Sequence, residues 1–231
     1  MEISTLQLPF QDPDQMTEED YLARVCAHFR VQRITVGSCG SCFFESIHAL
    51  LPTVGKAVKS SFDLRVRVVS FFRECQSKQH GDLGERIMDD VESAMLVPIV
   101  SSYAGTRGNN RKPKTIDAYL EAVSKRSVWV EGVHFVLFVF GASRIDPRIG
   151  FHWLRAIAHL YSVMVVVTIH GWSCVYTFGE MSHPVIRLWK CDVETHFEPL
   201  IPDECKCTLP AIHITLSHTL QISQQREMIR Q

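Results

Sequence analysis

Cys42 is the residue with the clearest potential for chemistry, because it directly follows a run of small residues, Gly37-Ser38-Cys39-Gly40-Ser41. The residues before this run alternate and include β-branched side chains, which predicts a strand, and those after it follow a helical period until Pro52. Cys42 is therefore expected where a strand ends and a helix begins. The unpaired N–H groups and the positive dipole end of a helix favour a thiolate over a thiol there. The pattern favours a nucleophilic cysteine over a buried structural one.

The backbone around Cys42 could also stabilise an anionic intermediate. Small residues let the main chain approach a ligand closely, so the amides of Gly40, Ser41 and Cys42 are candidates for an oxyanion hole. Cys39 is near enough to act as a resolving thiol, and mild oxidation would then join it to Cys42 in a reversible disulfide. The expected chemistry is nucleophilic catalysis by a thiolate.

The composition indicates one medium-sized globular domain. Among 231 residues, 24 Lys and Arg balance 25 Asp and Glu, so no overall charge favours nucleic acid or an anionic membrane as a partner. The longest apolar runs, around residues 133–140 and 162–169, are too short to span a bilayer, and the first residues lack the pattern of a secretory signal. We expect a monomer in the cytoplasm, with the nucleus as the alternative, whose eight cysteines are thiols.

The remaining patterns place helices early in the chain and strands late. This order predicts an α+β fold in which a small, mostly antiparallel sheet is flanked by helices. In such a fold, Cys42 at the start of a helix and His196 on a late strand would meet from opposite ends of the sequence. The expected helices lie near residues 17–29, 42–51, 64–75, 85–97, 116–123 and 154–161, and the expected strands near 31–36, 163–167, 175–178, 185–189 and 195–201.

Several motifs together resemble the ovarian-tumour (OTU) family of cysteine deubiquitinases. The run Cys39-Gly40-Ser41-Cys42-Phe43-Phe44-Glu45-Ser46-Ile47 resembles the nucleophile motif Asp-Gly-x-Cys-Leu/Phe-Phe-x-x-Ile, with Cys39 in place of Asp. His196-Phe197-Glu198 resembles the family's His-aromatic-Asp/Asn motif. The resemblance covers about residues 29–201. Other similar segments are Asp63-Leu64-Arg65, Tyr119-Leu120, Trp129 and residues 152–158, while Val130 stands where the family has Gly.

This resemblance implies a papain-like OTU fold and an activity. The enzyme would hydrolyse isopeptide or peptide bonds after the C-terminal glycine of ubiquitin, polyubiquitin or a ubiquitin-like modifier. Cys42 would be the nucleophile, His196 the base that takes its proton, and Glu198 the group that orients the imidazole. Gly40, Ser41 and Cys42 would supply the oxyanion hole, with no metal or organic cofactor.

The resemblance also divides the chain. We expect a helical lead-in over residues 1–28, a protease domain over residues 29–202 and a C-terminal tail over residues 203–231. Within the domain, residues 133–151 have no counterpart in the family pattern. They are either a surface insertion or retained intron sequence.

Other interpretations of the same residues stay open. The run Cys39–Phe43 also matches most of a papain-type Cys-Gly-Ser-Cys pattern, and Cys-x-x-Cys between strand and helix is typical of thiol-redox proteins. A zinc site could combine Cys39 and Cys42 with Cys205 and Cys207, although the second pair is closely spaced. The departures from the OTU motifs also allow a catalytically inactive protein that only binds ubiquitin.

Overall fold

The computed structural model describes residues 3–10, 12–37, 41–95, 113–125, 151–191 and 196–204. Along the chain these residues form β1 (Ile3–Gln7), the 3-10 helix η1 (Pro13–Gln15), α1 (Glu18–Phe29), β2 (Val31–Arg33), α2 (Cys42–Leu50), η2 (Leu51–Val54), α3 (Ser61–Gln76), α4 (Gly81–Met95), α5 (Ile116–Val123), α7 (Phe151–Tyr161), β3 (Met164–Ile169), β4 (Cys174–Phe178), β5 (Val185–Cys191) and β6 (His196–Pro202).

The strands form one six-stranded sheet in the order β1-β4-β3-β5-β6-β2. Only the β3–β5 pair is parallel among the described strands, so the expected α+β fold with a mostly antiparallel sheet is confirmed. β6 lies between β5 and β2, with Trp189 opposite Glu198 on one side and Arg33 opposite Leu200 on the other. Segments from both ends of the chain therefore flank the strand that carries His196.

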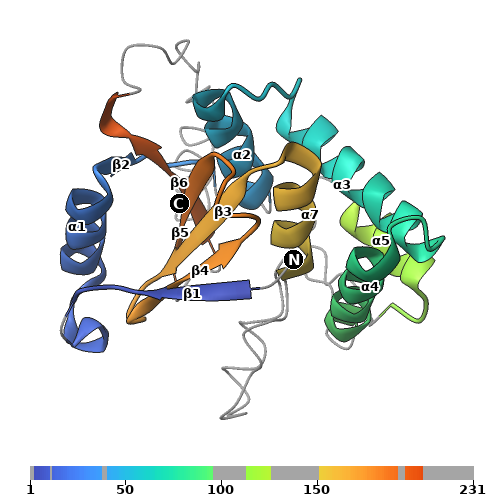
Figure 1. Cartoon of the computed structure of the whole chain (residues 1–231), viewed down its shortest axis with the longest axis horizontal. Helices are drawn as coiled ribbons and strands as arrows, with labels where there is room; N and C mark the ends of the chain where they lie inside the picture. Colours follow the sequence, from blue (N-terminus) through green and yellow to red (C-terminus); the bar gives the residue numbers. More distant parts are fainter. Residues whose placement is uncertain are drawn as a thin grey trace, which may run out of the picture.

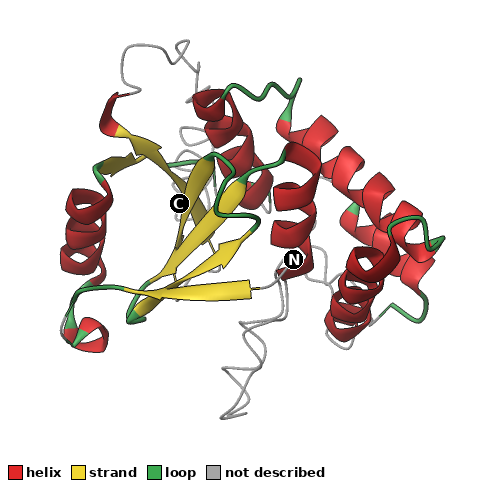
Figure 2. Ribbon diagram, viewed as in Figure 1, coloured by secondary structure: helices red, strands yellow, loops and turns green. Residues whose placement is uncertain are grey.

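Helices cover both faces of this sheet (Figures 1 and 2). α1 lies on one face, where Tyr21 and Val25 pack with Trp189 in a small core. The other α-helices gather on the opposite face, where a larger core includes Phe44 and Trp153. Every residue of β3 is buried, as expected for a central strand covered on both sides.

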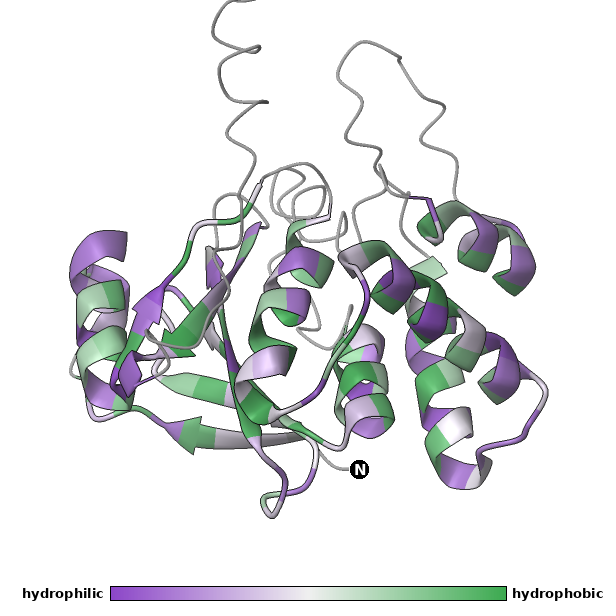
Figure 3. Ribbon diagram, turned by 90° about the horizontal axis from the view of Figure 1, so that it is seen from above, coloured by the Kyte–Doolittle hydropathy of each residue, from purple (hydrophilic) through white to green (hydrophobic). Residues whose placement is uncertain are grey.

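Side-chain hydrogen bonds cap the N-termini of α1 and α5. The side chain of Thr17 accepts a hydrogen bond from the Asp20 amide, and Thr115 caps α5 in the same way. Hydrophobic and hydrophilic residues alternate around the helices, which gives each one an apolar side for the core (Figure 3). No helix within the described ranges is both long and apolar enough to cross a membrane.

The N-terminal strand is the main element that the sequence patterns did not predict. β1 pairs with β4 in antiparallel register, and Ser4 to Gln7 are all exposed. An edge strand exposed on both faces has no buried period, so its sequence carries no strand signal. β2 is also shorter than the expected 31–36. The domain boundaries at residues 28 and 202 stay a prediction, and residues 133–150 and 205–231 lie outside the described part of the chain.

Two buried polar side chains join the helices behind the sheet. Nη1 of Arg65 on α3 donates hydrogen bonds of 2.9 Å to the carbonyl oxygens of Val123 and Lys125. These two bonds satisfy carbonyl groups at the C-terminal end of α5. On α7, His152 is fully buried, and its Nε2 lies 2.9 Å from the hydroxyl of Tyr119. Burial lowers the pKa of His152 to about 3, so the ring is neutral in the folded protein.

The buried neutral His152 makes folding stability depend on acid pH. Its unfolded pKa is about 6.5, so below that pH the unfolded chain binds a proton that the folded chain rejects. The free energy of unfolding should therefore fall by about 1.4 kcal/mol for each pH unit below about 6.5, until the pH approaches the folded pKa. Between pH 6.5 and pH 5, the free energy of unfolding measured in urea should fall by about 2 kcal/mol less in His152→Gln than in the wild type.

The control is His28→Gln, which removes an exposed imidazole from α1. It should keep the wild-type difference between the two pH values. An equal difference in all three proteins would contradict the burial of a neutral His152.

Candidate active site

Cys42 is the first residue of α2, as the sequence predicted. The first turn closes through a 2.9 Å hydrogen bond from the Glu45 amide to the Ser41 carbonyl. The amides at the start of any helix have no partner one turn earlier, so they are available to an anion next to Cys42. Cys42 itself is 2% exposed. Gly40 and Cys39 lie outside the described residues, so the complete oxyanion hole and the resolving thiol stay predictions.

His196, the first residue of β6, meets the thiol of Cys42. Contact with Cys42 and then with Glu198 raises the pKa of His196 to about 10, against the lowering effect of burial. Nε2 of the ring faces Glu198. Nδ1 is buried and makes no hydrogen bond within the described ranges, so it is the nitrogen left to exchange a proton with the thiol. The arrangement favours an imidazolium beside the thiol.

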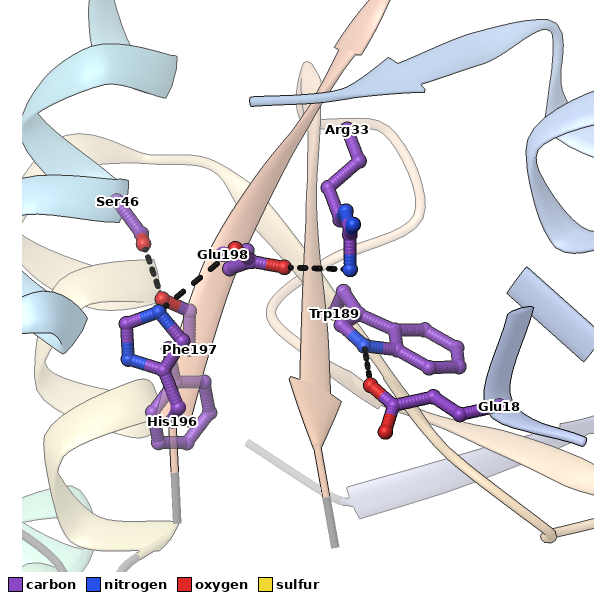
Figure 4. A network of polar contacts seen from close by, with 7 residues as sticks. All are labelled: Glu18, Arg33, Ser46, Trp189, His196, Phe197 and Glu198. Atoms are coloured by element: carbon purple, nitrogen blue, oxygen red, sulfur yellow. Dashed lines mark hydrogen bonds and ion pairs between the residues drawn. The ribbon is translucent and has the colours of Figure 1, made fainter. Parts of the chain in front are cut away.

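Glu198 divides its carboxylate between two cations (Figure 4). Oε1 lies 3.7 Å from Nε2 of His196, an ion-pair distance longer than a hydrogen bond, and Oε2 lies 3.3 Å from Nη1 of Arg33. Burial pushes the pKa of Glu198 upward, but His196, Arg33 and the hydroxyl of Thr35 together outweigh it and hold this pKa below its usual range. Glu198 is therefore an anion at neutral pH.

Ser46 links α2, which begins with Cys42, to β6, which begins with His196. Its hydroxyl donates a buried hydrogen bond of 3.0 Å to the carbonyl of Phe197, the residue between His196 and Glu198 (Figure 4). Ser46 follows Cys42 by one helical turn, so both side chains lie on the same face of α2. The ring of Phe43 also meets that of Phe197 edge to face, with centroids 5.3 Å apart. These contacts fix the distance between thiol and imidazole.

Trp189 on β5 provides an apolar neighbour for the carboxylate. It pairs with Glu198 across the two strands and is fully buried. Its indole N–H points away from the site and donates to Oε1 of Glu18 at 3.4 Å. Water is thus kept from one side of Glu198, and electrostatic interactions are stronger in such a dry environment.

The described residues supply no further ligand or second thiol for the zinc and thiol-redox interpretations of Cys42. Among these, no group of three or more His, Cys, Asp and Glu side chains could hold a metal ion. Cys26, Cys42, Cys75 and Cys174 are free thiols. Cys39, Cys205 and Cys207, which the zinc and redox hypotheses need, lie outside the described part of the chain.

The sequence patterns placed Cys42, His196 and Glu198 near one another, and the structure brings these three side chains together. They did not identify Arg33, Thr35 or Ser46 as neighbours of the site. Arg33 could have been suspected from the strand alternation before Cys42, but its partner strand was not predictable. Ser46 lies on the same helical face as Cys42, which was a usable signal.

No family model and no curated protein matches the chain. Solved structures similar to it include the OTU domain of OTUD1, at 13% identity and a TM-score of 0.45 over 80% of this chain and 94% of that chain. They also include the viral OTU domain protease from Farallon virus, at 18% identity and a TM-score of 0.39 over 74% of this chain and 83% of that one.

A third similar structure is an OTU deubiquitinase from Wolbachia pipientis wMel bound to ubiquitin. It shows 16% identity and a TM-score of 0.44, over 76% of this chain and 98% of that one. All three similarities are distant. The activity of the present chain is therefore inferred from its own side chains.

Ser46→Ala should loosen the contact between α2 and β6. Loss of one buried hydrogen bond should lower the free energy of unfolding by about 1 kcal/mol. Because Cys42 would be held less firmly beside His196, its alkylation by iodoacetamide at pH 6 should slow by about threefold or more. Urea unfolding and mass spectrometry of the Cys42 peptide measure the two effects.

Ser93→Ala is a matched control. Ser93 also donates from a helix to a backbone carbonyl, that of Asp89 at 2.9 Å, but it is exposed on α4. This variant should leave Cys42 alkylation unchanged. Equal alkylation rates in both variants and the wild type would show that Ser46 does not position the thiol.

Proposed function

We propose that this protein is a cysteine hydrolase that cleaves isopeptide or peptide bonds after the C-terminal glycine of ubiquitin or a ubiquitin-like modifier. Cys42 is the nucleophile, His196 the general base and acid, and Glu198 the residue that orients the imidazole. Amides at the start of α2 stabilise the oxyanion, with Gly40, Ser41 and Cys42 as the candidate donors. The reaction class follows from the site, and the ubiquitin substrate from the motif resemblance.

The observation that carries the proposal is the meeting of Cys42, His196 and Glu198 from separate parts of the chain. The thiol contacts the imidazole, and the opposite ring nitrogen faces a carboxylate at 3.7 Å. A buried histidine with only a structural role needs neither a thiol on one side nor a carboxylate on the other. This order of nucleophile, base and orienting group is the arrangement that activates cysteine for acyl transfer.

The proposed reaction has two stages. The Cys42 thiolate attacks the carbonyl carbon of the terminal glycine, and the negative charge that develops on the oxygen is held by backbone N–H groups. The tetrahedral intermediate collapses, the C–N bond breaks, and the imidazolium of His196 gives its proton to the leaving amine. A water molecule, deprotonated by His196, then attacks the thioester and releases the carboxylate and the thiolate.

The burial of the thiol limits what can react. With Cys42 only 2% exposed, a substrate must displace neighbouring groups to bring its carbonyl to the sulfur. A chain end made of glycine fits this demand best, since it has no side chain that would need room beside the thiolate. The same exclusion of water strengthens the ion pairs within the site.

A ubiquitin probe with a C-terminal electrophile tests the proposal directly. The wild type should form a covalent adduct that shifts its mass by that of the probe, and Cys42→Ala should form none. Cys39→Ala should still react, which separates hydrolase chemistry from a redox pair. Cys26→Ala, which removes a partly buried thiol on α1, is the control for nonspecific labelling.

An absence of adduct from the wild type, together with measurable ubiquitin binding, would instead assign the inactive binding protein. Labelling that persists in Cys42→Ala would reject Cys42 as the nucleophile.

The pH dependence of kcat/KM tests the role of Glu198. Activity requires the imidazolium, so the alkaline limb of the wild type should lie near the pKa of about 10 for His196. The Glu198 carboxylate stabilises the imidazolium, so Glu198→Gln should move this limb to lower pH. It should also reduce kcat/KM at pH 7 by about a hundredfold or more, because the ring loses its orientation.

Glu180→Gln, on an exposed turn, is the control and should change neither quantity. An alkaline limb at the same pH in Glu198→Gln and the wild type would contradict the proposed interaction.

A further inference from the structure

Arg33 occupies an unusual place for a charged residue near a reactive thiol. It ends β2, directly before the stretch that leads to Cys42, and is paired across the sheet with Leu200 of β6. The next residue, Ile34, donates its amide to the carbonyl of Pro199 at 3.1 Å, so the backbone next to Arg33 is tied to β6. From this anchored position Nη1 reaches Oε2 of Glu198 at 3.3 Å.

The environment of Glu198 explains why a cation is needed there. Its side chain is only 8% exposed, whereas that of Arg33 is 41% exposed. A carboxylate taken out of water is strongly disfavoured unless it is paired. Glutamate also has three rotatable torsions, so one contact with an imidazole at 3.7 Å does not fix its orientation. Arg33 supplies both the missing charge and the second point of attachment.

The other groups around Glu198 do not replace Arg33. From its own strand it faces His196, and the hydroxyl of Thr35 donates to it. From β5 it faces the apolar Trp189, while the nearby guanidinium of Arg187 lies over the ring of Phe29, 4.9 Å from its centroid. On the side of α1, the thiol of Cys26 lies near Arg33 and also near the carboxylate of Asp203, and the Glu18 carboxylate is bonded to the indole of Trp189.

We propose that Arg33 is a positioning residue of the active site, which holds one oxygen of Glu198 so that the other is presented, ionised, to Nε2 of His196. The effect of Arg33 on the reaction passes through Glu198. The expected effects on kinetics rest on the proposed function. The effect of Arg33 on the ionisation of the Glu198 carboxylate does not.

The sign of the effect follows from the charges. Removal of the guanidinium leaves the buried carboxylate with less compensation, so the pKa of Glu198 rises toward or above its ordinary range. The acid form then persists to higher pH, and a neutral Glu198 neither stabilises the imidazolium nor holds the ring. Activity should fall most on the acid side of the pH profile.

The experiment compares Arg33→Gln, Arg33→Lys and the wild type. Titration of the Glu198 carboxyl carbon by NMR, assigned through its absence in Glu198→Gln, should show a higher pKa in Arg33→Gln. For cleavage of a ubiquitin conjugate, kcat/KM at pH 6 should fall by about tenfold or more, and the acid limb should move upward. Arg33→Lys should restore part of the lowered pKa of Glu198 and part of kcat/KM, because lysine keeps the positive charge but lacks the planar guanidinium.

Two controls separate this role from a general structural effect. Arg24→Gln removes an exposed arginine from α1 and should change nothing. In the Glu198→Gln background, Arg33→Gln should have no further effect on kcat/KM, because a residue that acts through Glu198 has nothing left to position.

The inference is overturned if the Glu198 titration is the same in Arg33→Gln and the wild type, or if Arg33→Gln has its full effect without Glu198. If the wild type cleaves no ubiquitin conjugate, the proposed function fails, while the carboxyl titration still decides whether Arg33 holds Glu198 ionised.

Discussion

The contact between α2 and β6 is the constraint on which the rest of the site depends. A hydroxyl from Ser46 and the ring of Phe43 both meet Phe197, whose neighbours on either side are His196 and Glu198. The backbone of the strand is therefore held by the same helix that begins with Cys42. Because a helix and a strand are each stiff, two such contacts are enough to set the thiol beside the imidazole. The sheet and the helices behind it keep these two elements in place.

The same region must also keep charged groups where little water reaches them. His196 and Glu198 have side chains only 10% and 8% exposed, next to the fully buried Trp189. Buried charges are tolerated when each has a partner of opposite sign, and the chain provides an alternating series from His196 through Glu198 to Arg33. The last member is 41% exposed and connects this series to solvent. The contacts with Cys42 and Glu198 give His196 its raised pKa, against the lowering effect of burial.

The sequence alone predicted the parts of this site that depend on local patterns. The small residues before Cys42 and the helical period after it predicted where the thiol lies, and the late β-branched runs predicted the strands. The pairing of β2 with β6 was not predictable, because it depends on which edge of the sheet a three-residue strand joins. The role of Arg33 follows from that pairing, so its contact with Glu198 could not be inferred from the sequence. β1 was missed for a related reason, since an exposed edge strand has no buried period.

A thiol near the start of the chain and an imidazole near its end meet in one site, and this contact helps to keep the imidazole protonated. The most direct measurement is an NMR titration of the His196 ring in the wild type and in Cys42→Ala. The wild-type ring should titrate near pH 10, and removal of the sulfur should bring its pKa markedly down, toward the ordinary histidine range. A ring that titrates at the same pH in both proteins would contradict the pairing of Cys42 with His196.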